Sequence, residues 1–122
     1  MLSPSGELVT TCVKTFPFLP YEVDVSAGDE ACVFDVPGVG RFGIHICYDL
    51  WFPESSRELA MNGAEVILHP SLTDTCDRDV EKAMAIATAA QQQCYGFCPS
   101  THADRQSKLV MTNTFWFAPS FQ

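Results

Sequence analysis

Basic side chains are scarce in this sequence, which has 7 lysines and arginines against 15 aspartates and glutamates among its 122 residues. The resulting net charge of −8 repels the phosphate backbone of nucleic acids and the headgroups of anionic lipids. We therefore expect neither nucleic acid nor a membrane as a partner, which leaves small neutral or polar molecules as candidate substrates.

Long apolar stretches are also missing, since no run approaches the ~20 residues of a membrane span. The first residues lack the basic and apolar regions of a secretory signal peptide. We therefore expect a cytoplasmic location. The six cysteines are too sparse for a small secreted scaffold, so we expect mostly reduced thiols; they are Cys12, Cys32, Cys47, Cys76, Cys94 and Cys98.

The composition that remains is that of an ordinary globular domain, with 47% hydrophobic and 18% charged residues. Strand-like and helix-like patterns alternate along the chain, which is typical of an α/β layer protein. The strands are expected over 8–13, 31–36, 42–47 and 65–69, and the helices from Pro53 toward Gly63 and over 78–93. Pro17 and Pro20 make 16–22 a loop, and the short 37–40 connection predicts a hairpin. Asp77 is expected to cap the second helix.

Cys47 stands where a predicted strand turns into a helix. Such a junction lifts the side chain clear of the sheet, and the first helical amides beside it favour negative charge. Those amides favour a reactive thiolate and can hold the oxyanion of a tetrahedral intermediate. The backbone N–H of Tyr48 is the candidate oxyanion donor.

A long motif surrounds this cysteine, running from Gly40 to Glu54 as GRFGIHICYDLWFPE and followed by Arg57, Gly63-Ala64 and Pro70-Ser71. It resembles the carbon-nitrogen hydrolase (nitrilase) superfamily, most clearly over about residues 5–97. The resemblance implies a four-layer α-β-β-α sandwich, of which residues 1–122 form one partial domain. It also implies homo-oligomers and the use of no cofactor.

The same resemblance implies a Glu-Lys-Cys triad, in which Lys14 matches the lysine and Cys47 the nucleophile. Glu22 matches a second glutamate, eight residues after the lysine, that aliphatic amidases and formamidases use to position substrate and lysine. The triad's first glutamate, the general base, has no counterpart among the 13 residues before Lys14. We therefore expect a chain that begins inside the fold.

The implied chemistry is attack by the Cys47 thiolate on an amide carbon, loss of ammonia or an amine, and hydrolysis of the thioester. The order Cys47-Tyr48-Asp49 is more similar to the amidase branches than to the nitrile-cleaving ones, so a small amide is the expected substrate. Trp51 and Tyr21 are candidate walls of the substrate pocket.

Other interpretations remain open beside this one. Without its base the chain can be a non-catalytic remnant that acts only by association, or a redox sensor in which Cys47 pairs with Cys94 or Cys98. A pairing of Cys47 with His45 is disfavoured because residues two apart on a strand rarely reach each other. Cys94 and Cys98 lack partner ligands, so no metal is expected.

Overall fold

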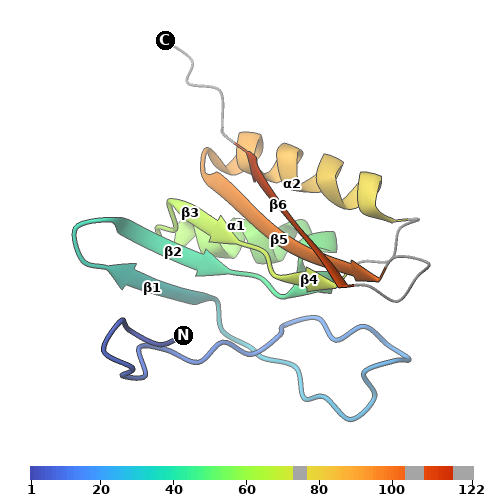
Figure 1. Ribbon diagram of the computed structural model, residues 1–122, viewed down its shortest axis with the longest axis horizontal. Coiled ribbons are helices and arrows are strands. Elements are labelled where there is room, and N and C mark those ends of the chain that lie inside the picture. Colours follow the sequence, from blue (N-terminus) through green and yellow to red (C-terminus); the bar gives the residue numbers. More distant parts are fainter. Residues whose placement is uncertain (73–76, 104–108, 117–122) are drawn as a thin grey trace.

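The computed structural model describes residues 1–72, 77–103 and 109–116. In chain order its elements are β1 (Cys32–Val36), β2 (Gly40–Ile44), the short 3-10 helix η1 (Cys47–Trp51), α1 (Pro53–Met61), β3 (Val66–Leu68), β4 (Ser71–Leu72), α2 (Arg78–Gln92), β5 (Tyr95–Ala103) and β6 (Leu109–Trp116). The strands form one mixed sheet in the order β1-β2-β3-β5-β4, with β6 paired to β5 (Figure 1).

The topology of this sheet brings two strand ends together. β1 and β2 form the predicted antiparallel hairpin, whereas β2 pairs in parallel with β3, and β3 with β5. The carboxyl ends of parallel strands lie at one edge of a sheet, where ligands commonly bind in α/β folds. The chain after β2, which contains Cys47, therefore lies beside the chain after β3, which contains Ser71.

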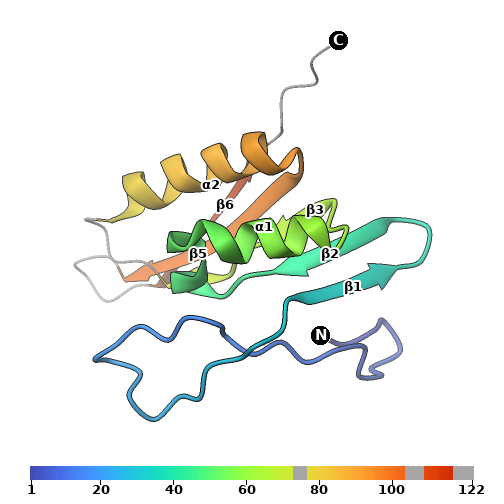
Figure 2. The same ribbon diagram turned by 180° about the vertical axis from the view of Figure 1, so that it is seen from behind.

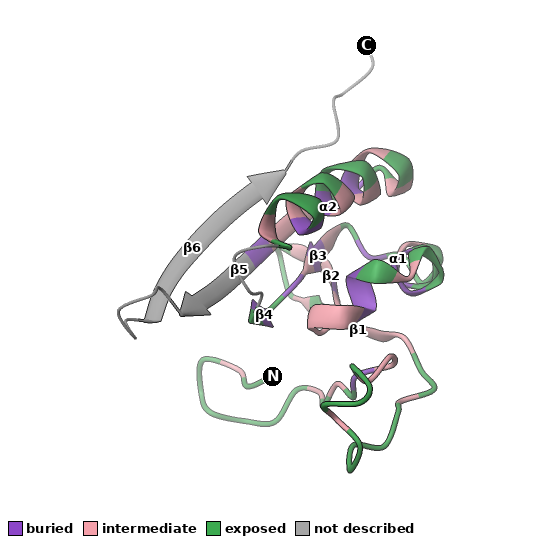
Figure 3. Cartoon of the chain, turned by 90° about the vertical axis from the view of Figure 1, so that its right-hand side faces the viewer, coloured by how far each residue is buried: buried purple, intermediate pink, exposed green. Residues whose placement is uncertain are grey.

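Both long helices cover the same face of the sheet (Figures 1 and 2). Their contact with it centres on buried Leu59, Ala64, Ile67 and Cys94. Gly43 permits the close approach of α1 to β2, because a Cβ there would meet Leu59 and Ala64 at 3.1 Å. Figure 3 shows the buried residues gathered between helices and sheet. This sheet and its helix layer supply two layers of the expected sandwich.

The segment before β1 departs from the prediction of a strand over 8–13. The chain reverses at Gly6, which has a left-handed φ of 84°, and Val9 N–H donates to the carbonyl of Met1 at 3.1 Å. The backbone thus pairs with its own first residues, leaving only an isolated bridge between Leu2 and Leu8. The 16–22 loop is confirmed.

A disulfide joins Cys12 to Cys32 and fastens this segment to the start of β1. The expectation of reduced thiols is wrong for these two residues, because the fold places their Cα atoms only 5.4 Å apart. Cys47, Cys94 and Cys98 are free, and Cys76 lies outside the described residues.

The helices begin near the predicted positions, but two local details differ. β2 ends at Ile44 rather than at Cys47, which is already the first residue of η1. Asp77 precedes α2 with a helical backbone and makes no capping hydrogen bond, because its φ of −97° and ψ of −5° do not suit a cap. The described part of the chain holds no helix of the length and hydropathy needed to cross a membrane.

Candidate active site

Cys47 occupies a sharp backbone turn between β2 and α1. Its φ of 53° lies in the left-handed region, which costs a non-glycine residue about 1 to 3 kcal/mol and persists only where the surroundings enforce it. Cys47 N–H donates to the carbonyl of Pro70 at 2.9 Å, so the chain after β3 holds the turn in place. The half-buried thiol is thereby presented at the sheet edge.

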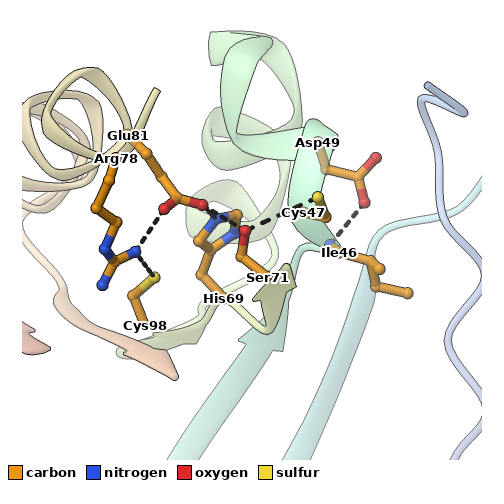
Figure 4. Close-up of polar contacts among 8 residues, drawn as sticks. All are labelled: Ile46, Cys47, Asp49, His69, Ser71, Arg78, Glu81 and Cys98. Atoms are coloured by element: carbon orange, nitrogen blue, oxygen red, sulfur yellow. Dashed lines mark hydrogen bonds and ion pairs between the residues drawn. The ribbon is translucent and has the colours of Figure 1, made fainter. Parts of the chain in front are cut away.

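Asp49 fixes the turn from the other side. Its carboxylate accepts a hydrogen bond from Ile46 N–H at 2.8 Å and another from Phe16 N–H at 2.7 Å, and only 2% of the residue is exposed. The first bond closes the turn around Cys47 (Figure 4), and the second ties the 16–22 loop to it. Asp49 therefore joins the two segments that the family resemblance marks as functional.

Lys14 and Glu22 form the predicted pair. Lys14 is 8% exposed, and its Nζ lies 2.6 Å from a carboxylate oxygen of Glu22. The hydrogen bond from Lys14 lowers the pKa of Glu22, and a second bond from Phe18 N–H lowers it further. Among the described residues, no hydrogen bond or ion pair joins Lys14 to Cys47.

A hollow of about 370 Å³ opens above the thiol. Its lining consists of Phe18, Cys47, Tyr48, Trp51, Leu72, Asp77 and Glu81. Trp51, a candidate pocket wall, lines this hollow beside Cys47. Tyr21 is 80% exposed and outside this lining, although its ring stacks on Phe18 at 5.3 Å. The N–H of Tyr48, at the second position of η1, has no acceptor within that helix.

A buried polar cluster lies beneath the hollow. The Oγ of Ser71 is 3.8 Å from the Sγ of Cys47 and forms a short hydrogen bond with a carboxylate oxygen of Glu81. His69 Nε2 lies 3.2 Å from the same oxygen, and Arg78 pairs with the other one. Figure 4 shows these side chains as a continuous row between Cys47 and Cys98.

Sequence reasoning missed most of this cluster. Pro70-Ser71 belongs to the family-like motif, but nothing in the sequence around His69 indicates a functional role. Glu81 lies on a predicted helix, ten residues after Ser71. The position of Ser71 could have indicated that it lies near Cys47, because the two residues follow neighbouring parallel strands, β3 and β2.

The cluster does not fit a metal ion. His69, Glu81 and Cys98 have donor atoms within 4.8 Å of one another, but the guanidinium of Arg78 contacts both the Glu81 carboxylate and, at 3.6 Å, the Cys98 sulfur. Burial also raises the pKa of the Cys98 thiol, which favours the protonated form that binds metal poorly. A fixed cation therefore already holds the place that a metal would take.

His45 faces the helix layer. Its Nε2 lies 2.9 Å from the Oγ of Ser56 on α1, and only 1% of the residue is exposed. Burial lowers the pKa of His45 to about 3. No hydrogen bond joins it to Cys47 within the described residues, so the structure offers no Cys-His pair at this position.

Comparisons with known proteins identify the family of this chain. The carbon-nitrogen hydrolase family model matches residues 3–117. A nitrilase of Pyrococcus abyssi is 54% identical over 39 residues, covering 32% of this chain and 14% of the relative. A formamidase of Bacillus thuringiensis is 38% identical over 72 residues, which cover 58% of this chain and 21% of the formamidase.

Solved structures show the same fold. One is an amidase variant from Nesterenkonia that carries the acetamide moiety of fluoroacetamide on its active-site cysteine. It aligns with this chain with a TM-score of 0.80 and 22% sequence identity. The alignment covers 93% of this chain and 44% of the amidase chain. Another is a branch 10 member of the nitrilase superfamily from Saccharomyces cerevisiae, which aligns with a TM-score of 0.77 and 26% sequence identity. This alignment covers 90% of this chain and 41% of the yeast chain.

The chain thus spans less than half the length of each of these proteins. The family model nevertheless covers nearly all of it, including the elbow that carries Cys47 and the strands that hold it. The chain belongs to the carbon-nitrogen hydrolase family.

Proposed function

We propose that this protein hydrolyses the carbon–nitrogen bond of a small amide, with Cys47 as the nucleophile. The observation that carries the proposal is the left-handed turn at Cys47, which presents a thiol to the floor of a hollow walled by Phe18, Tyr48 and Trp51. A strained backbone held by buried hydrogen bonds is a common means of presenting a reacting group.

The relatives support the choice of chemistry. Two of them are named for carbon–nitrogen chemistry, a formamidase and a nitrilase, and the Nesterenkonia amidase has an acetamide moiety bound at its active-site cysteine. Cys47 is the corresponding nucleophile in this proposal. Its thiolate adds to the carbonyl carbon, ammonia or an amine leaves with a proton, and water then cleaves the thioester to release the acid and the thiol.

The other predicted residues take supporting roles. Tyr48 N–H donates to the oxyanion, and Lys14, held by Glu22, supplies positive charge on the loop side. Trp51 contacts the substrate directly, whereas Tyr21 acts through the ring of Phe18. The hollow is small and aromatic, which favours a short acyl group.

Ammonia release tests this function. We expect the chain to release ammonia from formamide, acetamide or propionamide above the buffer rate, and Cys47→Ala to abolish that release. Cys94→Ala is the matched control, because Cys94 is also a free cysteine but lies in the core away from the hollow. Circular dichroism verifies that both variants fold. Equal rates for wild type and Cys47→Ala would favour the non-catalytic remnant.

A further inference from the structure

The hollow above Cys47 combines aromatic rings with an acidic side. Three of its lining side chains form a continuous aromatic panel. The ring centroids of Phe18 and Tyr48 lie 4.7 Å apart, and those of Tyr48 and Trp51 lie 6.2 Å apart. The face of an aromatic ring carries partial negative charge and attracts a cation within about 6 Å of the ring centroid. This panel therefore suits a positively charged group as well as an apolar one.

Two carboxylates, those of Asp77 and Glu81, line the same hollow. Glu81 is 1% exposed, and Arg78 balances its charge in a close ion pair. Lys14 lies outside this lining and is paired with Glu22. Asp77 is exposed at the start of α2, and in the ranges that the structure describes its side chain makes no capping hydrogen bond and no ion pair. Asp77 therefore gives the described lining one uncompensated negative charge.

We propose that the hollow selects small amides that carry an ammonium group on a short acyl chain, and that Asp77 sets this preference. The amide carbonyl lies over Cys47, the ammonium faces the Asp77 carboxylate, and the aromatic panel covers the chain between them. The volume of about 370 Å³ suits a small molecule, and the net charge of −8 attracts a cationic one over longer range. The inference rests on the proposed function in taking this hollow as the amide site.

The alternative is that Asp77 only places a favourable charge at the start of α2, where the helix dipole stabilises carboxylates. Asp79 shares that role, because it stands in the first turn of α2 and is exposed, but it does not line the hollow. Asp79→Asn is therefore a matched control for Asp77→Asn. It removes the same charge from the same end of the same helix, outside the hollow.

Charge-selective labelling of Cys47 tests the preference without any amide turnover. The two reagents are methanethiosulfonates of similar shape, one with a 2-aminoethyl group that is charged at neutral pH and one with a neutral propyl group. Each transfers its alkylthio group to the Cys47 thiolate, which forms a disulfide and releases methanesulfinate. Both rates depend on the thiolate fraction, so their ratio cancels it. The same ratio for free 2-mercaptoethanol corrects for intrinsic reactivity, and peptide mapping assigns the label to Cys47.

We expect the corrected ratio, aminoethyl over propyl, to exceed one in the wild type and to fall about threefold to fivefold in Asp77→Asn. That is the effect of one unit charge about 4 to 6 Å away in largely aqueous surroundings. Added salt should lower the wild-type ratio because exposed charges are screened, and Asp79→Asn should keep it. A wild-type ratio at or below one, an unchanged ratio in folded Asp77→Asn, or an equal fall in Asp79→Asn would overturn the proposal.

Ammonia release extends the test to substrates. β-Alaninamide and butyramide have similar shapes, but the first carries an ammonium group in place of a methyl group. We expect kcat/KM to be higher for β-alaninamide, and Asp77→Asn to reduce this advantage chiefly by raising the KM of β-alaninamide. Charge-selective labelling without ammonia release from either amide would support the cation preference while refuting the proposed function. Ammonia release without any preference between the two amides would refute the cation preference and leave the proposed function standing.

Discussion

At Cys47 the geometry depends on hydrogen bonds from two parts of the chain, the segment after β3 and the 3-10 helix η1. Pro70 accepts from its N–H, Asp49 closes the turn through Ile46, and Ser71 contacts its sulfur. Asp49 is the least replaceable of these residues, because it also accepts from Phe16 in the loop after Lys14. One carboxylate therefore sets the relative position of the nucleophile and the lysine loop.

Asp49→Ala should destabilise the protein by about 2 to 4 kcal/mol, because it leaves two partly buried N–H groups without acceptors. It should also slow Cys47 alkylation by loosening the turn. Urea unfolding measures the first effect. Asp24→Ala is the control, since Asp24 is exposed, and it should leave the unfolding midpoint unchanged. An equally stable Asp49→Ala protein would contradict this role.

His45 gives the protein a predictable response to acid. Burial depresses its pKa from 6.5 to about 3, so the unfolded chain binds a proton between these values and the folded chain does not. Stability therefore falls as pH drops from about 6.5 toward 3, by up to about 1.4 kcal/mol per pH unit. Urea midpoints at successive pH values should show this slope, and His45→Gln should flatten it. An unchanged slope in His45→Gln would refute the assignment.

Among the elements, those fixed by local patterns could be predicted from the sequence. Pro53 and Gly63 bound α1, and the 37–40 turn forms the hairpin before Cys47. Features made by distant residues could not. Cys12 meets Cys32 only because the first segment folds back along β1, and pairing among six cysteines is not deducible from sequence. Glu81 reaches Ser71 only after α2 has packed against the sheet.

The docking of α1 on the sheet depends on one apolar anchor. Leu59 is 2% exposed and packs against Gly43 and the core, whereas Met61 on the same helix is 75% exposed. Leu59→Ala should cost about 2 to 5 kcal/mol through lost burial and the cavity left behind. Met61→Ala should cost little. Chemical denaturation measures the free energy of unfolding of each variant. Similar losses of stability in Leu59→Ala and Met61→Ala would contradict this packing.

At the scale of the whole molecule, one sheet and one helix layer leave much apolar surface in contact with water. Large exposed side chains include Leu2, Leu8, Val13, Leu19, Val23 and Leu72. Solvent-exposed apolar area of this extent favours association. The structural neighbours are more than twice as long as this chain.

We therefore expect copies of this chain to associate. Sedimentation equilibrium should give a mass above the 13.5 kDa of one chain, with little dependence on salt because the contacts are apolar. Replacing Leu2 and Leu8 by serine should weaken the association without unfolding the core, since both side chains are exposed. A monomer at every concentration measured would contradict the expectation.

The most direct measurement of the central claim is the intact mass of the protein after rapid mixing with acetamide and quenching in acid. A Cys47 nucleophile predicts a population heavier by one acetyl group in place of the thiol hydrogen, with the added mass on the peptide that contains Cys47 and none in Cys47→Ala. Ammonia release without any such adduct, or an adduct that persists in Cys47→Ala, would contradict the account.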